Sequence, residues 1–346
     1  MPAELLIELL LILLVILGLK KTINKKEFNI VYIIGVYLLS TIMIFFYRGL
    51  DNAYSVIDYV LIYKSIFYLF LLSLQTRNSF TINNLKYIFY VLLFFFVVKY
   101  SVGYFIYSIP RPGLFTENNF EIMLLLLLFL SLSYHHIALN KLAIISFIFV
   151  VFISGSRSAQ ACLVFIYFFL YHDISFNKKL IKYGIVSFLL FIFIVLFMNR
   201  LGGVSIDSID RVKFLIIFIE ELKYLNFQDV LFGTDIITPL SPASCSQLQF
   251  YSSLFSSKDS SVCFSVILHS YIFRAIFDHG IIGLTLLMFM FWRLLVIQGF
   301  DKRFSSIFIF TVLLNGLSVS SFNSVFFAFS FYLVNSSSKS LIKSSI

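Results

Sequence analysis

Charged residues are scarce in this sequence. They make up 12% of its 346 residues, whereas hydrophobic residues make up 60%. A water-soluble globule of this length cannot keep so much apolar surface covered. The composition therefore excludes a soluble protein and predicts one whose surface is covered largely by membrane lipid.

The signatures of common soluble enzymes are also missing. The sequence contains no P-loop, no GxGxxG after a strand, no CxxC and no HExxH. Nothing in it indicates a nucleotide or metal site, so we expect no cofactor and no metal. The adjacent His135 and His136 fall at a predicted helix end, where solvated histidines are a better interpretation than a metal pair.

The hydrophobic residues occur in continuous runs rather than in alternation with polar ones. Such runs exclude a β-barrel and predict helices, because every backbone polar group in hydrocarbon needs an internal partner. We therefore expect an all-α polytopic membrane protein with about eleven transmembrane helices. They lie near residues 4 to 19, 29 to 47, 55 to 74, 85 to 107, 120 to 139, 141 to 154, 158 to 171, 180 to 198, 280 to 298, 304 to 319 and 321 to 335.

Basic residues predict the orientation, because short loops rich in Lys and Arg stay in the cytoplasm. The cluster from Lys20 to Lys26 places the first loop inside, and alternation then places the N-terminus outside. Three regions follow: an N-terminal bundle of about eight helices (1–198), a long outer loop with a re-entrant or half-helix segment (199–279), and the last helices with a cytoplasmic tail (280–346). The inner loops account for most of the net charge of +9, so we expect no nucleic-acid partner.

Two of the three cysteines, Cys245 and Cys263, lie in the long outer loop. An oxidising outer compartment would join a pair brought within bonding distance, so we predict a disulfide between them. Cys162 lies in a predicted span and is expected to be a small apolar filler.

Several basic residues are predicted on the outer side, where positive charge is normally rare. They are Arg48, Arg111, Arg157, Arg200, Arg211 and Arg274, with Lys64 and Lys99 inside spans. A charge in hydrocarbon is costly and usually faces a cavity that binds something, so these residues indicate an anionic ligand. The alternative is that they pair with lipid phosphates or with Asp207, Asp210 and Glu220.

Four segments resemble the signatures of bacterial O-antigen polymerases and ligases. They are RPGLFTENN (111–119), SGSRSA (154–159), Arg211 followed by LFG (231–233), and HSYIFRAIFDHGIIGL (269–284). The family's histidine is commonly followed by Asn, whereas here Ser270 follows His269. The acidic residue before the first glycine is Asp278, with His279 intervening.

The resemblance implies a membrane glycosyltransferase of GT-C-like architecture in the bacterial inner membrane, with its active site facing the periplasm. Such an enzyme polymerises O-antigen repeat units carried on undecaprenyl diphosphate and releases undecaprenyl diphosphate. It also implies contact with membrane lipids and with a protein that regulates chain length. Because fixed arginines stabilise a leaving diphosphate without a metal, a metal-independent reaction is expected. Inversion at the anomeric carbon is expected because one direct displacement requires no nucleophilic carboxylate.

Residue roles follow from the same resemblance. Arg157 and Arg211 are expected to clamp the diphosphate, and His269 to act as the base or to orient the acceptor hydroxyl. The remaining expected contacts are Arg111 and Glu117 at the sugar, with Lys99 and Arg274 as secondary phosphate contacts.

Two alternatives share parts of this pattern. An O-antigen ligase, which transfers the finished polysaccharide to lipid A core, uses the same Arg and His segments. A flippase of the same pathway would instead show related halves or broken helices near the bilayer midplane. The RPGLFTENN segment and the gathering of notable charges at one face favour the polymerase.

Overall fold

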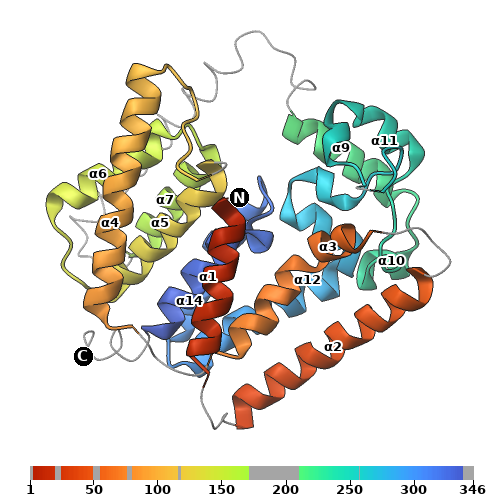
Figure 1. The fold of residues 1–346 in the computed structure, drawn as a ribbon, viewed down its shortest axis with the longest axis horizontal. Helices are drawn as coiled ribbons and strands as arrows, with labels where there is room; N and C mark the ends of the chain where they lie inside the picture. The colour runs from red at the N-terminus through yellow and green to blue at the C-terminus, as the bar shows by residue number, and fades with distance from the viewer. Residues whose placement is uncertain are drawn as a thin grey trace.

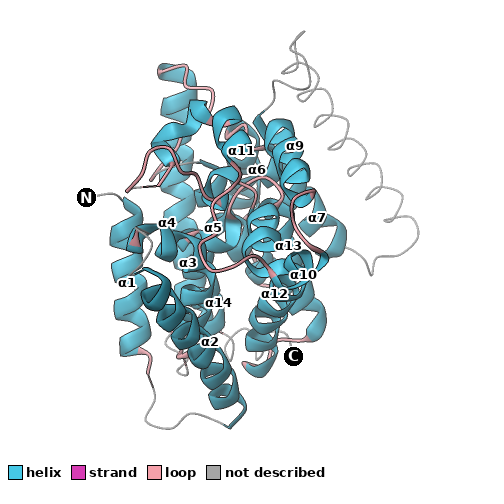
Figure 2. Ribbon diagram, turned by 90° about the vertical axis from the view of Figure 1, so that its right-hand side faces the viewer, coloured by secondary structure: helices cyan, strands magenta, loops and turns pink. Residues whose placement is uncertain are grey.

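The computed structural model describes residues 3–19, 25–49, 55–75, 80–115, 118–170, 210–256 and 258–337. Within these ranges the chain forms helices and loops and no strand, as Figure 2 shows. The fold is therefore all-helical, as the sequence predicts.

The N-terminal half forms seven helices within the described residues, and several of them begin at a polar cap. The side chains of Ser55, Thr81 and Asn140 accept hydrogen bonds from backbone N–H groups in the first turns of their helices, which stabilises those starts. The helices are α1 (Ala3–Leu17), α2 (Lys25–Gly49), α3 (Val56–Ser73), α4 (Ile82–Ser101) with the π-turn η1 (Val102–Ile106), α5 (Asn118–Tyr134), α6 (Lys141–Ile153) and α7 (Arg157–Leu170).

The C-terminal half begins with short helices and continues with long ones. The first group comprises α9 (Asp210–Leu222), α10 (Phe227–Phe232), α11 (Pro242–Gln247), η3 (Gln249–Leu254) and η4 (Ser265–Leu268). The second comprises α12 (Tyr271–Ile297), α13 (Lys302–Gly316), η5 (Ser321–Asn323) and α14 (Val325–Ser336). In Figure 1 the first group lies at the right, with α9 and α11 above α10.

Every predicted span coincides with a helix except 180 to 198, which lies outside the described residues. The span predicted near 280 to 298 is the longer part of α12, and residues 271 to 279 form a shorter helical part before it. The helix passes through a kink at Gly280, whose φ is 70°. Polar and charged residues before this kink interrupt the apolar run, and this is why hydropathy identifies only the longer part.

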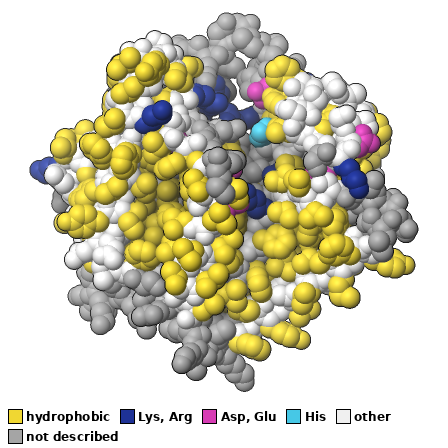
Figure 3. Space-filling model, in the orientation of Figure 1, with side chains coloured by type: hydrophobic (Ala, Val, Ile, Leu, Met, Phe, Trp, Pro, Cys, Tyr) yellow, Lys and Arg dark blue, Asp and Glu magenta, His cyan; other side chains and the backbone are white. Residues whose placement is uncertain are grey.

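The arrangement of apolar side chains is that of a membrane-embedded protein. In the part of the chain that the structure describes, four helices are long and apolar enough to cross a membrane: Phe28–Tyr47, Val56–Ser73, Ile82–Ile106 and Tyr271–Ile297. Large apolar side chains on the outer helices are exposed, for example Met43 at 72% and Phe94 at 64%. Figure 3 shows apolar side chains spread across the middle of the visible face and into its lower part. Lipid is the solvent that accommodates a surface of this kind.

Two hydrophobic cores hold the fold together. The larger one is centred on α5, which is buried along most of its length and packs against α4, α7, α13 and α14. The smaller one joins the short helices to the start of α12. Its buried members are Phe214, Ile217, Phe218, Leu240, Cys245, Leu248, Phe255, Cys263, Ile267, Leu268 and Phe277. This second core fixes the short helices at one end of α12.

Candidate functional site

The RPGLFTENN and SGSRSA segments lie in contact. The side-chain amide of Asn118 donates to the carbonyl of Ser154 across 2.6 Å. Gly155 has a φ of 63°, and a Cβ there would lie 3.1 Å from the carbonyl oxygen of Pro110 and 3.7 Å from Cγ of Arg111. Glycine adopts this left-handed conformation without steric cost and leaves room for the Arg111 loop. The turn thus positions both segments together.

A buried carboxylate holds the Arg111 loop to α5. Glu121 is fully buried and accepts hydrogen bonds from the backbone N–H groups of Leu114 (2.5 Å) and Phe115 (2.6 Å) and from the hydroxyl of Tyr100 (2.7 Å). Three donors to one carboxylate satisfy a group that is otherwise costly to bury. The loop therefore has a defined conformation relative to α4 and α5.

The other polar residues singled out in the N-terminal half fall into different situations. Glu117 lies outside the described residues. Lys99 is exposed on α4, next to the buried Tyr100. Lys64, expected to face an anionic ligand, pairs instead with Glu8 at 2.6 Å, and this carboxylate also accepts a hydrogen bond from Tyr68. An ion pair between α1 and α3 accounts for this in-span lysine.

Arg157 is the first residue of α7 and is half-buried. Before it, the hydroxyl of Ser154 accepts from the backbone N–H of Ser156, and the hydroxyl of Ser156 accepts from the backbone N–H of Ala159. These hydrogen bonds stabilise the turn before α7, which positions the guanidinium of Arg157. Because the start of a helix carries partial positive charge, an arginine there makes the position strongly electropositive and suited to an anion.

Arg211 and His269 both lie close in sequence to members of the second core, Phe214 and Leu268. Arg211 is in the first turn of α9, and Phe214, one turn later, has its ring centroid 5.3 Å from that of His269. The ring of Tyr251 lies 6.0 Å from the same imidazole. His269 has a φ of 55°, an uncommon conformation for a residue with a side chain, and such strain concentrates at functional sites. The structure thus brings the Arg211 segment to the histidine.

Tyr251 is a neighbour of His269 that sequence reasoning did not identify. Burial, together with a hydrogen bond to Asp210, raises the pKa of its hydroxyl to about 12. The phenol therefore stays protonated at neutral pH and does not serve as a base.

Residues 315 to 320 connect the Arg111 side to the His269 side. The amide of Asn315 lies 3.5 Å from the carbonyl oxygen of Asn119, the hydroxyl of Ser270 donates to the carbonyl of Gly316 (3.2 Å), and the hydroxyl of Ser320 donates to the carbonyl of His269 (2.8 Å). Sequence reasoning missed this segment. Its signal is the polar run NGLSVSSFNS between two apolar spans.

Arg274 is directed at protein atoms. Its Nη1 donates to the hydroxyl of Ser320 (2.8 Å) and its Nη2 donates to the carbonyl of Leu61 (2.9 Å), and only 5% of the residue is exposed. Since Ser320 also donates to the carbonyl of His269, its hydroxyl connects Arg274 to the histidine segment. The expected role of Arg274 as a secondary phosphate contact stays a prediction.

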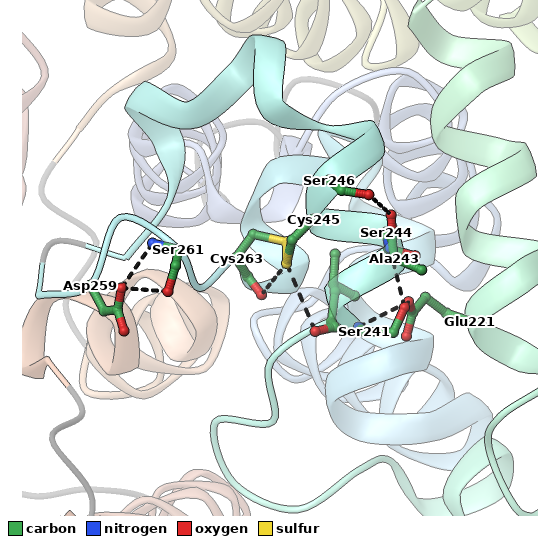
Figure 4. Close-up of a disulfide and its surroundings, with 10 residues drawn as sticks. Glu221, Ser241, Ala243, Ser244, Cys245, Ser246, Asp259, Ser261 and Cys263 are labelled. Atoms are coloured by element: carbon green, nitrogen blue, oxygen red, sulfur yellow. Dashed lines mark hydrogen bonds between the residues drawn. A yellow bond between two sulfur atoms is a disulfide. The ribbon is translucent and has the colours of Figure 1, made fainter.

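The structure contains the disulfide between Cys245 and Cys263, with Cα atoms 5.6 Å apart (Figure 4). Beside it, Glu221 of α9 accepts hydrogen bonds from the backbone N–H and the hydroxyl of Ser241, and the N–H of Leu240 donates to the carbonyl of Cys263. Together these bonds connect α9, α11 and the segment before η4.

The LFG and DHG sequences dock through their glycines. Gly233 has a φ of 91°, and a Cβ there would lie 2.6 Å from the carbonyl oxygen of Asp278. The N–H of Thr234 donates to the carbonyl of Phe277 (2.9 Å), and Asp278 accepts a hydrogen bond from Ser265. At Gly280, a Cβ would collide with the backbone of Leu231. Only glycine permits this close approach of two backbones, so α10 packs directly against the kink of α12.

Polar groups gather where these segments meet. Figure 3 shows Lys, Arg, acidic and His side chains around a hollow in the upper part of the visible face. Among the described residues no group of three or more His, Cys, Asp or Glu side chains is arranged to hold a metal ion. The arrangement offers guanidinium groups, a titratable imidazole and hydroxyls, which suit binding of an anion and proton transfer to or from a hydroxyl.

Comparison with known proteins gives no match to a family model and no match to a curated protein.

Proposed function

We propose that the protein is a glycosyltransferase of the inner membrane that polymerises undecaprenyl-diphosphate-linked O-antigen repeat units at the periplasmic face. The observation that carries the proposal is the junction made by residues 315 to 320. Hydrogen bonds that Asn315 and Ser320 donate, and one that the carbonyl of Gly316 accepts, join the RPGLFTENN segment to the histidine segment, which are far apart in sequence. Segments that resemble one family's signatures therefore converge at one end of the bundle.

In the proposed reaction an acceptor sugar hydroxyl attacks the anomeric carbon of the donor. The bond from that carbon to the diphosphate oxygen breaks, and its electron pair leaves with undecaprenyl diphosphate. Arg157 and Arg211 stabilise the developing negative charge, because fixed cations in a partly dry site need no reorganisation as the reaction proceeds. His269 accepts the proton of the attacking hydroxyl or orients it. A single displacement inverts the anomeric centre.

The surrounding residues have supporting roles in this proposal. Arg111 and Glu117 line the sugar site, and Lys99 is a secondary phosphate contact. Arg274 positions His269 through Ser320, because its two terminal nitrogens are both used in bonds to the protein. About eleven spans and a periplasmic active site belong to the proposal, as does a partner protein that sets chain length.

A deletion strain with plasmid complementation tests this function. Loss of a polymerase leaves lipopolysaccharide with core and a single repeat unit, and the wild-type gene restores the ladder. Loss of a ligase or of a flippase leaves bare core, which would reject the proposal in favour of one of these alternatives.

Alanine variants of the two clamp residues test the assignment of the site in the same strain. Arg157→Ala and Arg211→Ala should each reduce polymerisation by about 2 to 4 kcal/mol of transition-state stabilisation, the cost of losing one preorganised electrostatic contact. Lys223→Ala is the matched control, because Lys223 is an exposed cation directly after α9. Full ladders from both arginine variants, at wild-type protein levels, would contradict the assignment.

A further inference from the structure

The short helix α10 exposes large aromatic side chains. Phe227 and Phe232 are 77% and 67% exposed, and Tyr224, in the turn before α10, is 74% exposed. With about 100° of rotation per residue, Phe227, Gln228, Leu231 and Phe232 share one side of the helix. Exposed apolar side chains gathered in this way mark a surface that binds something.

The glycine junction places α10 where the apolar part of α12 begins. A Cβ at Gly280 would collide with the backbone of Leu231, and a Cβ at Gly233 would collide with the backbone of Asp278. Residues 281 to 292 (IIGLTLLMFMFW) follow at once and include no charged residue. A spanning helix passes from the headgroups into the hydrocarbon where its charged residues end. The junction therefore holds α10 near the boundary between headgroups and acyl chains.

The exposed side of α10 is continuous with the lipid-facing surface of the bundle. Phe232 lines the same groove as Ile33 of α2 and Leu286 of α12, and each of these two residues is 52% exposed. Both helices are long and apolar enough to cross a membrane, so their exposed side chains face lipid. With six residues, α10 is itself too short to cross one. Lipid that surrounds α2 and α12 thus reaches Phe232 as well.

The charges near this surface favour insertion through aromatic rings rather than attraction to charged lipid. Between residues 223 and 232 the charged residues are Lys223 and Asp229, and their charges cancel. Asp229 accepts a hydrogen bond from the backbone N–H of Asn226 across 3.1 Å, which stabilises the start of α10. Polar residues interleaved with exposed aromatic ones are typical of segments that lie at the level of the headgroups.

We propose that α10 is an interfacial anchor, a helix at the membrane surface whose Phe227 and Phe232 insert among the lipids of the adjacent leaflet. Residues 223 to 226 connect it directly to α9, whose Phe214 and Phe218 belong to the second core. The anchor therefore fixes the second core to the membrane surface. This inference does not depend on the proposed reaction.

Spin-label accessibility on the purified full chain tests the anchor. Gln228→Cys, in a Cys162→Ala background, places a nitroxide on the exposed side of α10 and leaves both phenylalanines in place. Gln249→Cys is the matched control, because Gln249 is an exposed glutamine beside the 87% exposed Phe250. It belongs to η3, which follows α11, and α11 lies above α10 in Figure 1.

Oxygen dissolves in hydrocarbon, whereas a nickel chelate stays in water. In phosphatidylcholine vesicles we expect the label at position 228 to collide severalfold more often with oxygen than with the chelate. The label at position 249 should show the opposite order. Because Lys223 and Asp229 cancel, addition of phosphatidylglycerol should leave the depth of the label at position 228 unchanged.

Removal of the rings tests what holds α10 at this depth. Phe227→Ser combined with Phe232→Ser should move the label at position 228 into water, whereas Phe250→Ser should not, and an unchanged spectrum at position 249 shows that the unit stays folded. In the unsubstituted patch, a label at position 228 that meets the chelate as often as the label at position 249 would overturn the proposal. A label that meets neither reagent would also overturn it, because protein would then cover this surface. The same holds for a depth that requires anionic lipid or persists without the two rings.

Discussion

Loss of the disulfide between Cys245 and Cys263 should loosen the second hydrophobic core. The two cysteines are 18 residues apart in the sequence. Closing a loop of this length removes conformational entropy from the unfolded chain worth about 3 kcal/mol. The bridge lies in the same core as Phe214, whose ring contacts His269. The free energy needed to open this core should therefore fall by about 3 kcal/mol, and since every 1.4 kcal/mol is tenfold, its amides should exchange about 100-fold faster.

Hydrogen exchange followed by mass spectrometry on the purified full chain measures this effect. The double variant Cys245→Ser and Cys263→Ser should exchange faster in α9 and α11 and remain unchanged in α5, which belongs to the other core. Cys162→Ala is the control for thiol loss, because Cys162 is free and buried in the larger core. Acceleration of less than about threefold in α9 and α11 would refute the reasoning that the bridge stabilises this core.

Further substitutions test three sets of contacts that position the site, each by thermal or denaturant unfolding of the purified protein. Glu121→Gln should lower the free energy of unfolding by about 2 kcal/mol, because the N–H group of the glutamine amide would face one of the three donors that now bind the carboxylate. Tyr100→Phe, which removes one of these donors, should lower it by about half as much. Equal stability of Glu121→Gln and wild type would contradict this. Arg274→Lys should cost about 2 kcal/mol, because an ammonium cannot reach both acceptors of the guanidinium, and an unchanged midpoint would show that these bonds are dispensable. Gly233→Ala should lower the free energy of unfolding by about 2 to 5 kcal/mol, because the added Cβ strains the backbone and overpacks the junction with α12. Gly35→Ala is the control and should be neutral or stabilising, because a Cβ there meets only an ordinary 3.4 Å contact. Similar effects of the two substitutions would contradict the tight junction.

The helical fold could be predicted from sequence because its evidence is local. Continuous apolar runs predicted helices at all the described spans, since the hydrocarbon environment leaves few other backbone structures. The start of α12 could not be found in this way. Arg274, Asp278 and His279 lower the hydropathy of that stretch, and the Ser320 hydroxyl and Leu61 carbonyl that satisfy Arg274 are distant in the sequence.

The candidate site could be predicted only where unusual residues stand out. An arginine on the side where basic residues are rare is conspicuous, and so is a histidine within a recognisable segment. Asn315, Ser320 and Tyr251 are ordinary polar residues. Asn315 and Ser320 matter through contacts with residues 46 or more positions away in the sequence. The junction of Gly233 with α12 is likewise visible only when the two backbones are seen together. The sequence therefore predicted the charged residues of the candidate site but not the residues that position them.

The central claim is that arginines and a histidine at one end of this helical bundle transfer sugar from a lipid diphosphate. Its most direct test uses the purified full chain in nanodiscs with a defined undecaprenyl-diphosphate-linked repeat unit, and follows both products by mass spectrometry. The wild type should form oligomers of the repeat unit and release one undecaprenyl diphosphate for each bond made, and Arg211→Ala should lose nearly all of this activity. An unconsumed donor, or an Arg211→Ala variant as active as the wild type, would contradict the claim.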